Sequence, residues 1–134
     1  MTAPSKGLLD TSVLIASETG RPLEVDKLPE EVFSSVVTIA ELQAGVLAAP
    51  DTATRARRLA TLDAVAGLEA LPIDIIAARH WATLRVRLAE EGRWINVNDL
   101  WIAAVAAAHD LPVVTQDSDY DPLESIGGPP VIRI

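Results

Sequence analysis

The sequence predicts an α/β fold with three layers, in which a mostly parallel sheet of about four or five short strands is flanked by helices. Short apolar runs alternate along the chain with longer segments of helical spacing, and this order is typical of right-handed crossovers between parallel strands. Several runs are β-branched, as in strands that are buried on both faces. With 134 residues, of which 49% are hydrophobic, residues 1–134 suit a single domain with its own core.

Composition excludes several classes of function. The absence of cysteine rules out disulfides, thiolate metal ligands and a cysteine nucleophile. We find no secretion signal and no apolar run long enough to span a bilayer, so we expect a cytoplasmic protein with no membrane contact. The net charge of −8 disfavours nucleic-acid binding in general. Arginines nevertheless cluster at residues 55–58 and 79–93; we interpret them as solvated helix faces, with contact to nucleic-acid phosphates as the alternative.

The first element is an apolar run at residues 7–9, which we expect to be a short strand that ends at Asp10. A helix starts after it, and the two hydroxyl side chains that follow the acid can cap this helix or hold the carboxylate in place. One glycine, two prolines and several charges predict a loop at residues 20–29. Residues 32–34 are the second expected strand.

Helical spacing follows at residues 37–47, with Glu41 in the early turns. After a break, a second helix is expected at about 53–66, and its inward stripe includes Leu59. Residues 71–73 form a minimal strand. These segments extend the alternation of strands and helices.

A longer helix runs from Asp74, its cap, to about Glu91, with Ile76 on its apolar stripe. Asn98 is the expected N-cap of the next helix, and Asp99 would lie in its first turn, where the helix dipole favours negative charge. An alanine run then favours the helix and allows close packing against it.

The C-terminal part contains residues 113–115, a β-branched run typical of a central parallel strand. Asp117 lies just past its carboxyl end, where ligands gather in open parallel sheets. Residues 118–130 are rich in turn formers, and residues 131–134 are the last expected strand, at an edge of the sheet.

Four acids share one position in this pattern, because each lies at the end of a strand or the start of a helix beside apolar sequence. They are Asp10, Glu41, Asp99 and Asp117. The carboxyl ends of parallel strands meet at one rim, and carboxylates gathered there repel one another unless a cation joins them. A site made only of oxygen ligands selects Mg²⁺ or Mn²⁺ over zinc. The alternative is that each acid is simply a helix cap, as we interpret Asp74.

Other candidates are weaker. Asp119 and Asp121 are interpreted as turn residues, with contact of Asp119 to a cation through a water molecule as the alternative. His80 and His109 are far apart in sequence and have no cysteine beside them, which makes a poor zinc site. No glycine-rich phosphate motif and no defensible serine triad is present. Trp101 is assigned to packing.

Four segments together resemble the PIN domain and, within that group, a VapC-type toxin of a bacterial type II toxin–antitoxin pair. They are LDTSVLI at 9–15, TIAELQAG at 38–45, NDLWIAA at 98–104 and VVTQD at 113–117. Each motif alone is weak, but four in this order and at this chain length are specific. Trp101 departs from the pattern, since smaller or aliphatic residues are commoner there.

The resemblance implies an endoribonuclease that depends on Mg²⁺ or Mn²⁺ and cleaves structured RNA, such as transfer or ribosomal RNA, by attack of a metal-activated water on a phosphodiester. It assigns the four acids to the catalytic and metal-binding quartet of the family. It makes Thr115 the hydroxyl residue near the metal, with Thr11 and Ser12 in support. It further implies a homodimer and a cognate antitoxin that covers the active-site groove.

Other families that place acids at strand ends fit less well. A receiver domain needs a lysine after its fifth strand, and the only lysines are Lys6 and Lys27. A haloacid-dehalogenase-like phosphatase needs a second acid where Ser12 stands. The remaining alternative is a catalytically silent PIN fold that serves as an RNA- or protein-binding module.

Overall fold

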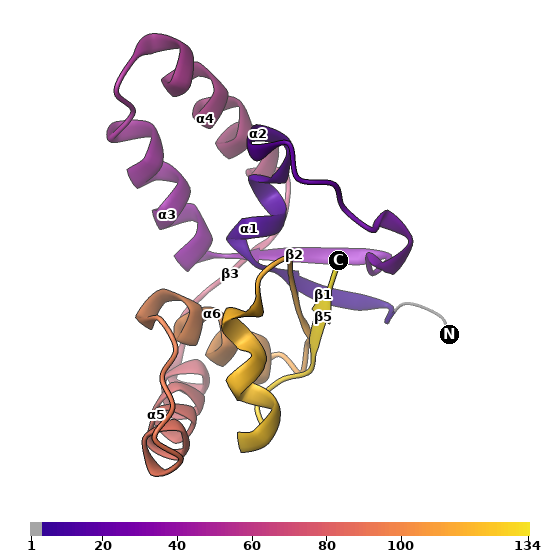
Figure 1. The fold of residues 1–134 in the computed structure, drawn as a ribbon, viewed down its shortest axis with the longest axis vertical. Helices are drawn as coiled ribbons and strands as arrows, with labels where there is room; N and C mark the ends of the chain where they lie inside the picture. Colours follow the sequence, from indigo (N-terminus) through magenta and orange to yellow (C-terminus); the bar gives the residue numbers. More distant parts are fainter. Residues whose placement is uncertain (1–3) are drawn as a thin grey trace.

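A single sheet organises the molecule. The computed structural model describes residues 4–134, and in them five strands pair in the order β3-β2-β1-β4-β5 (Figure 1). The strands are β1 (Lys6–Leu9), β2 (Glu31–Ser35), β3 (Ala70–Leu71), β4 (Val113–Thr115) and β5 (Val131–Arg133). Every pairing is parallel, so the carboxyl ends of all these strands lie on one edge of the sheet. The α/β prediction with a mostly parallel sheet is confirmed.

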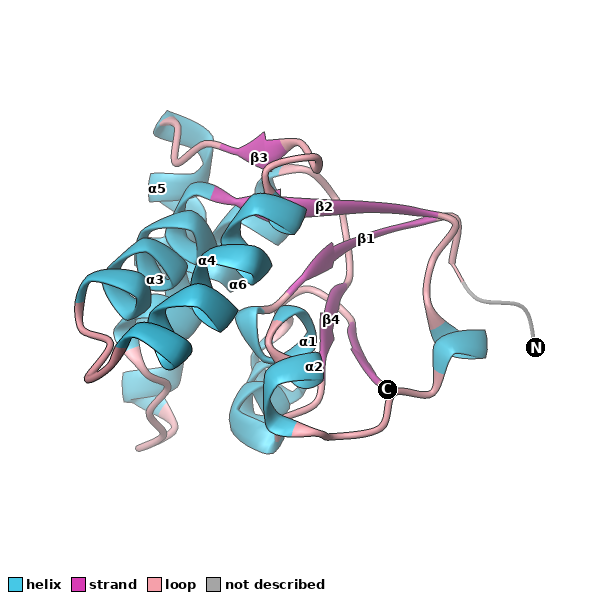
Figure 2. Cartoon of the chain, turned by 90° about the horizontal axis from the view of Figure 1, so that it is seen from above, coloured by secondary structure: helices cyan, strands magenta, loops and turns pink. Residues whose placement is uncertain are grey.

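Helices cover both faces of this sheet. They are α1 (Thr11–Leu14), α2 (Ala16–Thr19), α3 (Val36–Leu47), α4 (Thr52–Val65), α5 (Ile75–Glu90) and α6 (Val97–Ala108), with 3₁₀ helices η1 (Val25–Lys27) and η2 (Ser118–Ile126). α1, α2 and the α3–α4 hairpin lie on one side, and α5, α6 and η2 on the other (Figures 1 and 2). The three layers of the prediction are therefore present.

Alternating side chains of the central strands build a core on each face, as the period of a strand requires. Leu8 and Val113 join the larger core with α5, α6 and η2. The next residue of each strand, Leu9 and Val114, joins the smaller core with α1 and the C-terminus. The two cores hold β1 and β4 rigidly, and these are the strands that lead into the acids.

α6 is the most deeply buried helix. Its residues 102–106 are all fully buried, and most of them are alanines, so that the sheet and α5 can approach its backbone closely. Trp101 stacks on Trp81 of α5 at a centroid distance of 4.9 Å, as the assignment to packing predicts. This packing fixes the first turn of α6, which carries Asp99.

Several element boundaries differ from the prediction. α6 begins at Val97, two residues earlier than predicted. The expected N-cap Asn98 is wrong, because the side chain of Asn96 caps the helix by accepting from the backbone N–H of Asn98 at 2.9 Å. The third strand is Ala70–Leu71 instead of residues 71–73. Much of the turn-rich segment is η2, and residues 20–29 include η1. Within residues 4–134, no helix combines the length and the apolar character needed to cross a lipid bilayer.

Candidate active site

Asp10 is the buried centre of the site. It follows β1, caps α1, and is only 4% exposed. Its Oδ2 atom accepts three hydrogen bonds: from the Ser12 backbone N–H at 3.3 Å, from the Ser12 hydroxyl at 2.7 Å and from the Thr115 hydroxyl at 3.0 Å. A carboxylate has about four lone-pair directions on its two oxygens. Oδ2 is therefore fully occupied, and Oδ1 faces the remaining space.

The hydroxyl of Tyr120 joins Asp10 to Asp99. It lies 2.7 Å from Oδ1 of Asp10 and 3.3 Å from Oδ1 of Asp99. The side chain is fully buried. Burial, followed by the charges of the two acids, raises the pKa of the Tyr120 phenol far above its usual value, so the group remains a neutral donor. Sequence reasoning missed this residue because it lies in a segment that reads as turns; a lone aromatic among polar turn residues was the available signal.

Asp99 lies in the first turn of α6 and is about half-buried. Its carboxyl pKa is raised from 3.8 to about 7, and burial is the largest cause. Three acids add to the shift, in the order Asp10, Asp119 and Glu41, while the Tyr120 hydrogen bond opposes it. The carboxylates of Asp10, Asp119 and Glu41 therefore lie close enough to Asp99 to repel it.

Glu41 reaches this cluster from α3 through a chain of hydroxyls. Its Oε1 accepts from the Thr11 hydroxyl at 2.8 Å, and Thr11 also lies 3.0 Å from the hydroxyl of Thr38. Ser35 continues the chain, because its Oγ accepts from the Thr38 backbone N–H and caps α3. The chain links α1 to α3 and orients Glu41. Thr38 belongs to the TIAELQAG motif but was given no role there, and Ser35 lies outside the motifs.

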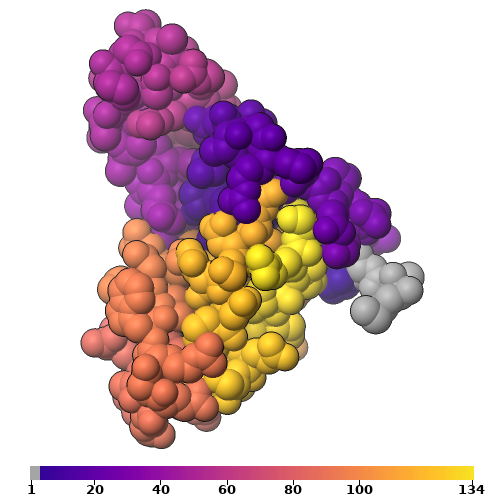
Figure 3. Space-filling view, in the orientation of Figure 1, coloured from indigo at the N-terminus to yellow at the C-terminus, as the bar shows by residue number. Residues whose placement is uncertain are grey.

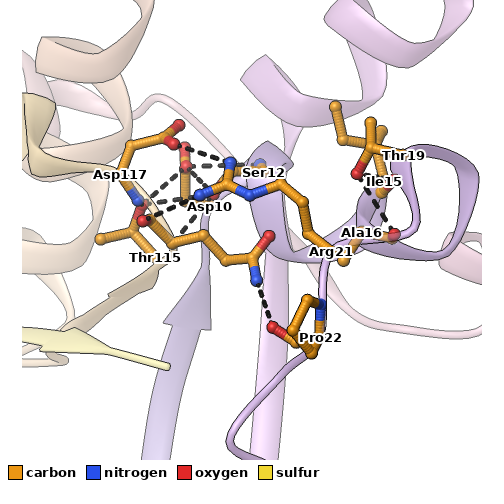
Figure 4. A network of polar contacts seen from close by, with 10 residues as sticks. Asp10, Ser12, Ile15, Ala16, Thr19, Arg21, Pro22, Thr115 and Asp117 are labelled. Carbon is orange, nitrogen blue, oxygen red and sulfur yellow. Dashed lines mark hydrogen bonds and ion pairs between the residues drawn. The ribbon is translucent and has the colours of Figure 1, made fainter.

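Asp117 is placed differently from the other three predicted acids. Its Oδ1 accepts from Nη1 of Arg21 at 3.1 Å, and Nη2 of the same arginine donates to the Gln116 carbonyl at 3.3 Å (Figure 4). Asp117 is also absent from the charges that raise the pKa of Asp99. It sits at the rim of the site, and Asp119 occupies the place in the electrostatic cluster that was expected for it. The role of Asp117 in metal binding stays a prediction.

A hard divalent cation fits the chemistry of these residues. Among residues 4–134, no three histidine, cysteine or acidic side chains are grouped closely enough to bind one ion directly. Mg²⁺, however, keeps several of its waters and needs only one or two carboxylates. Asp10 and Asp99, joined by one hydroxyl, supply two, and burial together with the charges of neighbouring acids raises the pKa of Asp99. The donors are all oxygen, as Mg²⁺ and Mn²⁺ prefer.

A pocket of about 420 Å³ opens beside the acids, between α1–α2 and the α3–α4 hairpin. Thr11 and Glu41 line it, and so do Arg57 and Arg58 of α4. In the space-filling view, the indigo atoms of the N-terminal helices lie directly against the magenta atoms of the hairpin (Figure 3). Arginines of the first predicted cluster thus face a hollow next to carboxylates.

The model of the PIN domain matches residues 7–125. The chain belongs to the PIN domain family. It is 55% identical over 133 residues to Ribonuclease VapC5 of Mycobacterium tuberculosis, covering 99% of this chain and 98% of that protein. Ribonuclease VapC4 of the same organism is 40% identical over 116 residues, with 86% and 88% covered.

Two solved structures share the fold of this chain. A crystal structure of VapBC-5, from the VapBC family of toxin-antitoxin systems of Mycobacterium tuberculosis, matches with a TM-score of 0.91 and 53% identity, over 98% of this chain and all of that one. FitAcB from Neisseria gonorrhoeae matches with a TM-score of 0.75 and 30% identity, over 94% of this chain and 96% of that one. The predicted resemblance is confirmed at the level of both sequence and fold.

Proposed function

We propose that the protein is a Mg²⁺- or Mn²⁺-dependent endoribonuclease and the toxin of a toxin–antitoxin pair. Membership of the PIN domain family and relatives named ribonucleases support RNA cleavage. The observation that carries the proposal is the meeting of Asp10 and Asp99 on one buried hydroxyl, with Glu41 and Asp119 close enough to raise the pKa of Asp99. A merely structural cluster of caps has no reason to bring four like charges together.

When bound, the divalent cation would lower the pKa of a water molecule and neutralise charge on the phosphate. Oδ1 of Asp10 and the carboxylate of Asp99 would hold it, since Oδ2 of Asp10 is already occupied by Ser12 and Thr115. Glu41, oriented by Thr11, and Asp119 would reach its waters. The neutral hydroxyls around Asp10 fix the carboxylate without cancelling its charge.

Substrate RNA has to approach an acidic protein, and the structure offers one route. Arg57 and Arg58 line the same pocket as Glu41, so cationic side chains lie near an acid of the proposed site. Phosphate contacts from such arginines offset the net charge of −8. We propose that structured RNA, of the transfer or ribosomal class, enters along this pocket.

The proposed partner is a cognate antitoxin that covers the same pocket. The matching structures named VapBC are of toxin–antitoxin systems, which supports such a partner for this chain. A homodimer is also part of the proposal. Light scattering of the purified chain would test it, with a mass twice that of one chain as the expected result.

The deciding experiment measures cleavage of total RNA by the purified chain, with Mg²⁺ and with a chelator. We expect Mg²⁺-dependent cleavage that falls at least about 100-fold in Asp10→Asn and in Asp99→Asn, because each change removes a cation ligand. Asp63→Asn, at an exposed position on α4, is the matched control and should cleave normally.

Undiminished cleavage by both site variants would remove the assignment of these acids. The silent-module alternative predicts no cleavage by any of the proteins, together with retained binding of RNA or of a small partner protein. Measuring RNA binding in the same samples distinguishes a nuclease from such a silent binding module.

A further inference from the structure

We infer that Tyr120 is a positioning residue of the proposed cation site, because its buried hydroxyl holds Oδ1 of Asp10 and Oδ1 of Asp99 toward a common point. The inference rests on the proposed function. It concerns a residue outside the four motifs that carry the family resemblance. Tyr120 lies in η2, so it connects the C-terminal segment to acids from β1 and α6.

The first step concerns the hydrogen bonds that the two carboxylate oxygens of Asp10 accept. Ser12 and Thr115 place three donors on Oδ2, which leaves no direction there for a cation. Oδ1 accepts only the Tyr120 hydroxyl among the hydrogen bonds in residues 4–134. One lone pair of Oδ1 is therefore free, and the phenol decides which way that lone pair points.

The second step is the bridge to Asp99. A phenol has a single proton, so it donates to one carboxylate at a time, and the shorter distance of 2.7 Å marks Asp10 as the preferred acceptor. At 3.3 Å, Asp99 is still within hydrogen-bond distance. Without such a donor, the buried carboxylate of Asp10 and the half-buried one of Asp99 would turn away from each other, because like charges repel more strongly where there is less water between them.

The third step is the rigidity of the ring. Tyr120 is fully buried in the larger core together with Leu123 and Ile126 of the same 3₁₀ helix. The chain after η2 passes so close that a Cβ at Gly128 would lie 2.9 Å from the Leu123 side chain. The hydroxyl is thus presented from a fixed frame, as a group that positions metal ligands must be.

A purely structural role makes a different prediction. If Tyr120 only packs the core and satisfies a buried acid, its hydroxyl affects folding stability and not the affinity for a cation. Tyr120→Phe separates the two roles, because it keeps the ring and removes both hydrogen bonds. Ser125→Ala is the matched control: it also removes a hydroxyl from η2 that donates to a carboxylate, that of Glu91 at 2.8 Å, away from the acids of the site.

The experiment titrates Mn²⁺ into the full chain without RNA and measures free Mn²⁺ by electron paramagnetic resonance. We expect Tyr120→Phe to weaken Mn²⁺ binding about tenfold, as loss of groups that orient metal ligands commonly does. Ser125→Ala should bind as the wild type does. Thermal unfolding of the same samples reports any change in stability separately.

A second measurement needs no variant. Tyr120 is the single tyrosine of the chain, so tyrosine labelled with ¹³C at Cζ gives one NMR signal. Addition of Mg²⁺ should shift that signal in the wild type and leave it unmoved in Asp99→Asn.

Unchanged Mn²⁺ affinity in Tyr120→Phe, or a Cζ signal that Mg²⁺ leaves unmoved while Mn²⁺ binds the wild type, would overturn the role of Tyr120 and leave the proposed function standing. No Mn²⁺ binding by the wild type would overturn both.

Discussion

Asp10 and Asp117, two of the four predicted site acids, are held in opposite ways. Asp10 is 4% exposed and is surrounded by neutral donors. The Asp117 side chain is 36% exposed and pairs with the cationic Arg21. Neutral hydroxyls orient a carboxylate and leave its charge in place, whereas an arginine both orients and neutralises it. The buried centre therefore keeps a charge for a cation to meet, and the rim does not.

The pKa of Asp99 shows this difference between Asp10 and Asp117. Burial raises its pKa most, and the charges of Asp10, Asp119 and Glu41 raise it further, whereas Asp117 is not among the causes. A sequence motif places acids near a sheet edge, but the neighbours of each acid decide whether it joins the cluster. Substitutions that change either the buried centre at Asp10 or the rim at Asp117, but not both, test this difference.

The largest effect is expected on folding. Asp10→Ala leaves the buried donors of Ser12, Thr115 and Tyr120 without an acceptor, and should lower the free energy of unfolding by about 3 kcal/mol. Asp117→Ala removes a solvent-exposed ion pair and should cost less than about 1 kcal/mol. Urea unfolding of both variants at pH 5 measures the two losses. At this pH Asp99 is protonated, so removing the charge of Asp10 does not also stabilise the protein by relieving repulsion between the two acids. Equal losses would contradict the division into centre and rim.

The second effect is a pH dependence. The carboxyl of Asp99 has a pKa of about 7 in the folded chain and about 3.8 when unfolded, so the folded state holds its proton more tightly. That stabilisation is complete below pH 4 and is lost as the pH rises through 7. Without divalent cations, the wild type should lose stability between pH 5 and pH 8 more steeply than Asp99→Asn does.

Addition of Mg²⁺ should flatten the wild-type profile, since the cation stabilises the charged carboxylate. Urea unfolding at the two pH values, with and without Mg²⁺, measures both effects. Parallel profiles for the wild type and Asp99→Asn would show that the folded structure does not raise the pKa of Asp99.

The sequence was sufficient for the fold because its main signals are local. Helical spacing, caps and β-branched runs predict elements one at a time, and parallel crossovers then order them. Helical spacing did not predict burial correctly at positions where packing between elements determines it. Leu59 and Ile76 were assigned to inward stripes but are 45% and 43% exposed. Periodicity shows which residues share a helix face, but not whether another element covers that face.

The site was predictable only in part, for a related reason. Asp10, Glu41 and Asp99 follow from their positions at strand and helix ends, which the topology brings together. The approach of Asp119 and the bridge by Tyr120 depend on the path of η2, a 3₁₀ helix in a segment that reads as turns. The pairing of Arg21 with Asp117 joins residues that are 96 positions apart, and no local signal predicts it.

The third effect compares the two acids that follow β4. Asp119→Asn should weaken Mn²⁺ binding about tenfold, because it removes a charge that acts on Asp99. Asp117→Asn should change it less than about twofold, because Arg21 already neutralises that carboxylate. Titration of both variants with Mn²⁺ measures the order. The reverse order would return Asp117 to the metal-binding quartet and make its pairing with Arg21 a contact that the cation displaces.

The smallest effect is expected from Arg21→Ala. The ion pair with Asp117 is about half exposed on the arginine side, so its loss should lower the free energy of unfolding by only about 0.5 kcal/mol, and by less at high salt. The loop keeps a second link, since Nε2 of Gln116 donates to the Pro22 carbonyl at 2.9 Å. Urea unfolding in low and high salt measures the change, and RNA cleavage in the same samples should stay near the wild-type rate. A large loss of cleavage with unchanged stability and Mn²⁺ affinity would mean that Arg21 contacts the RNA, and the rim would then belong to the catalytic machinery after all.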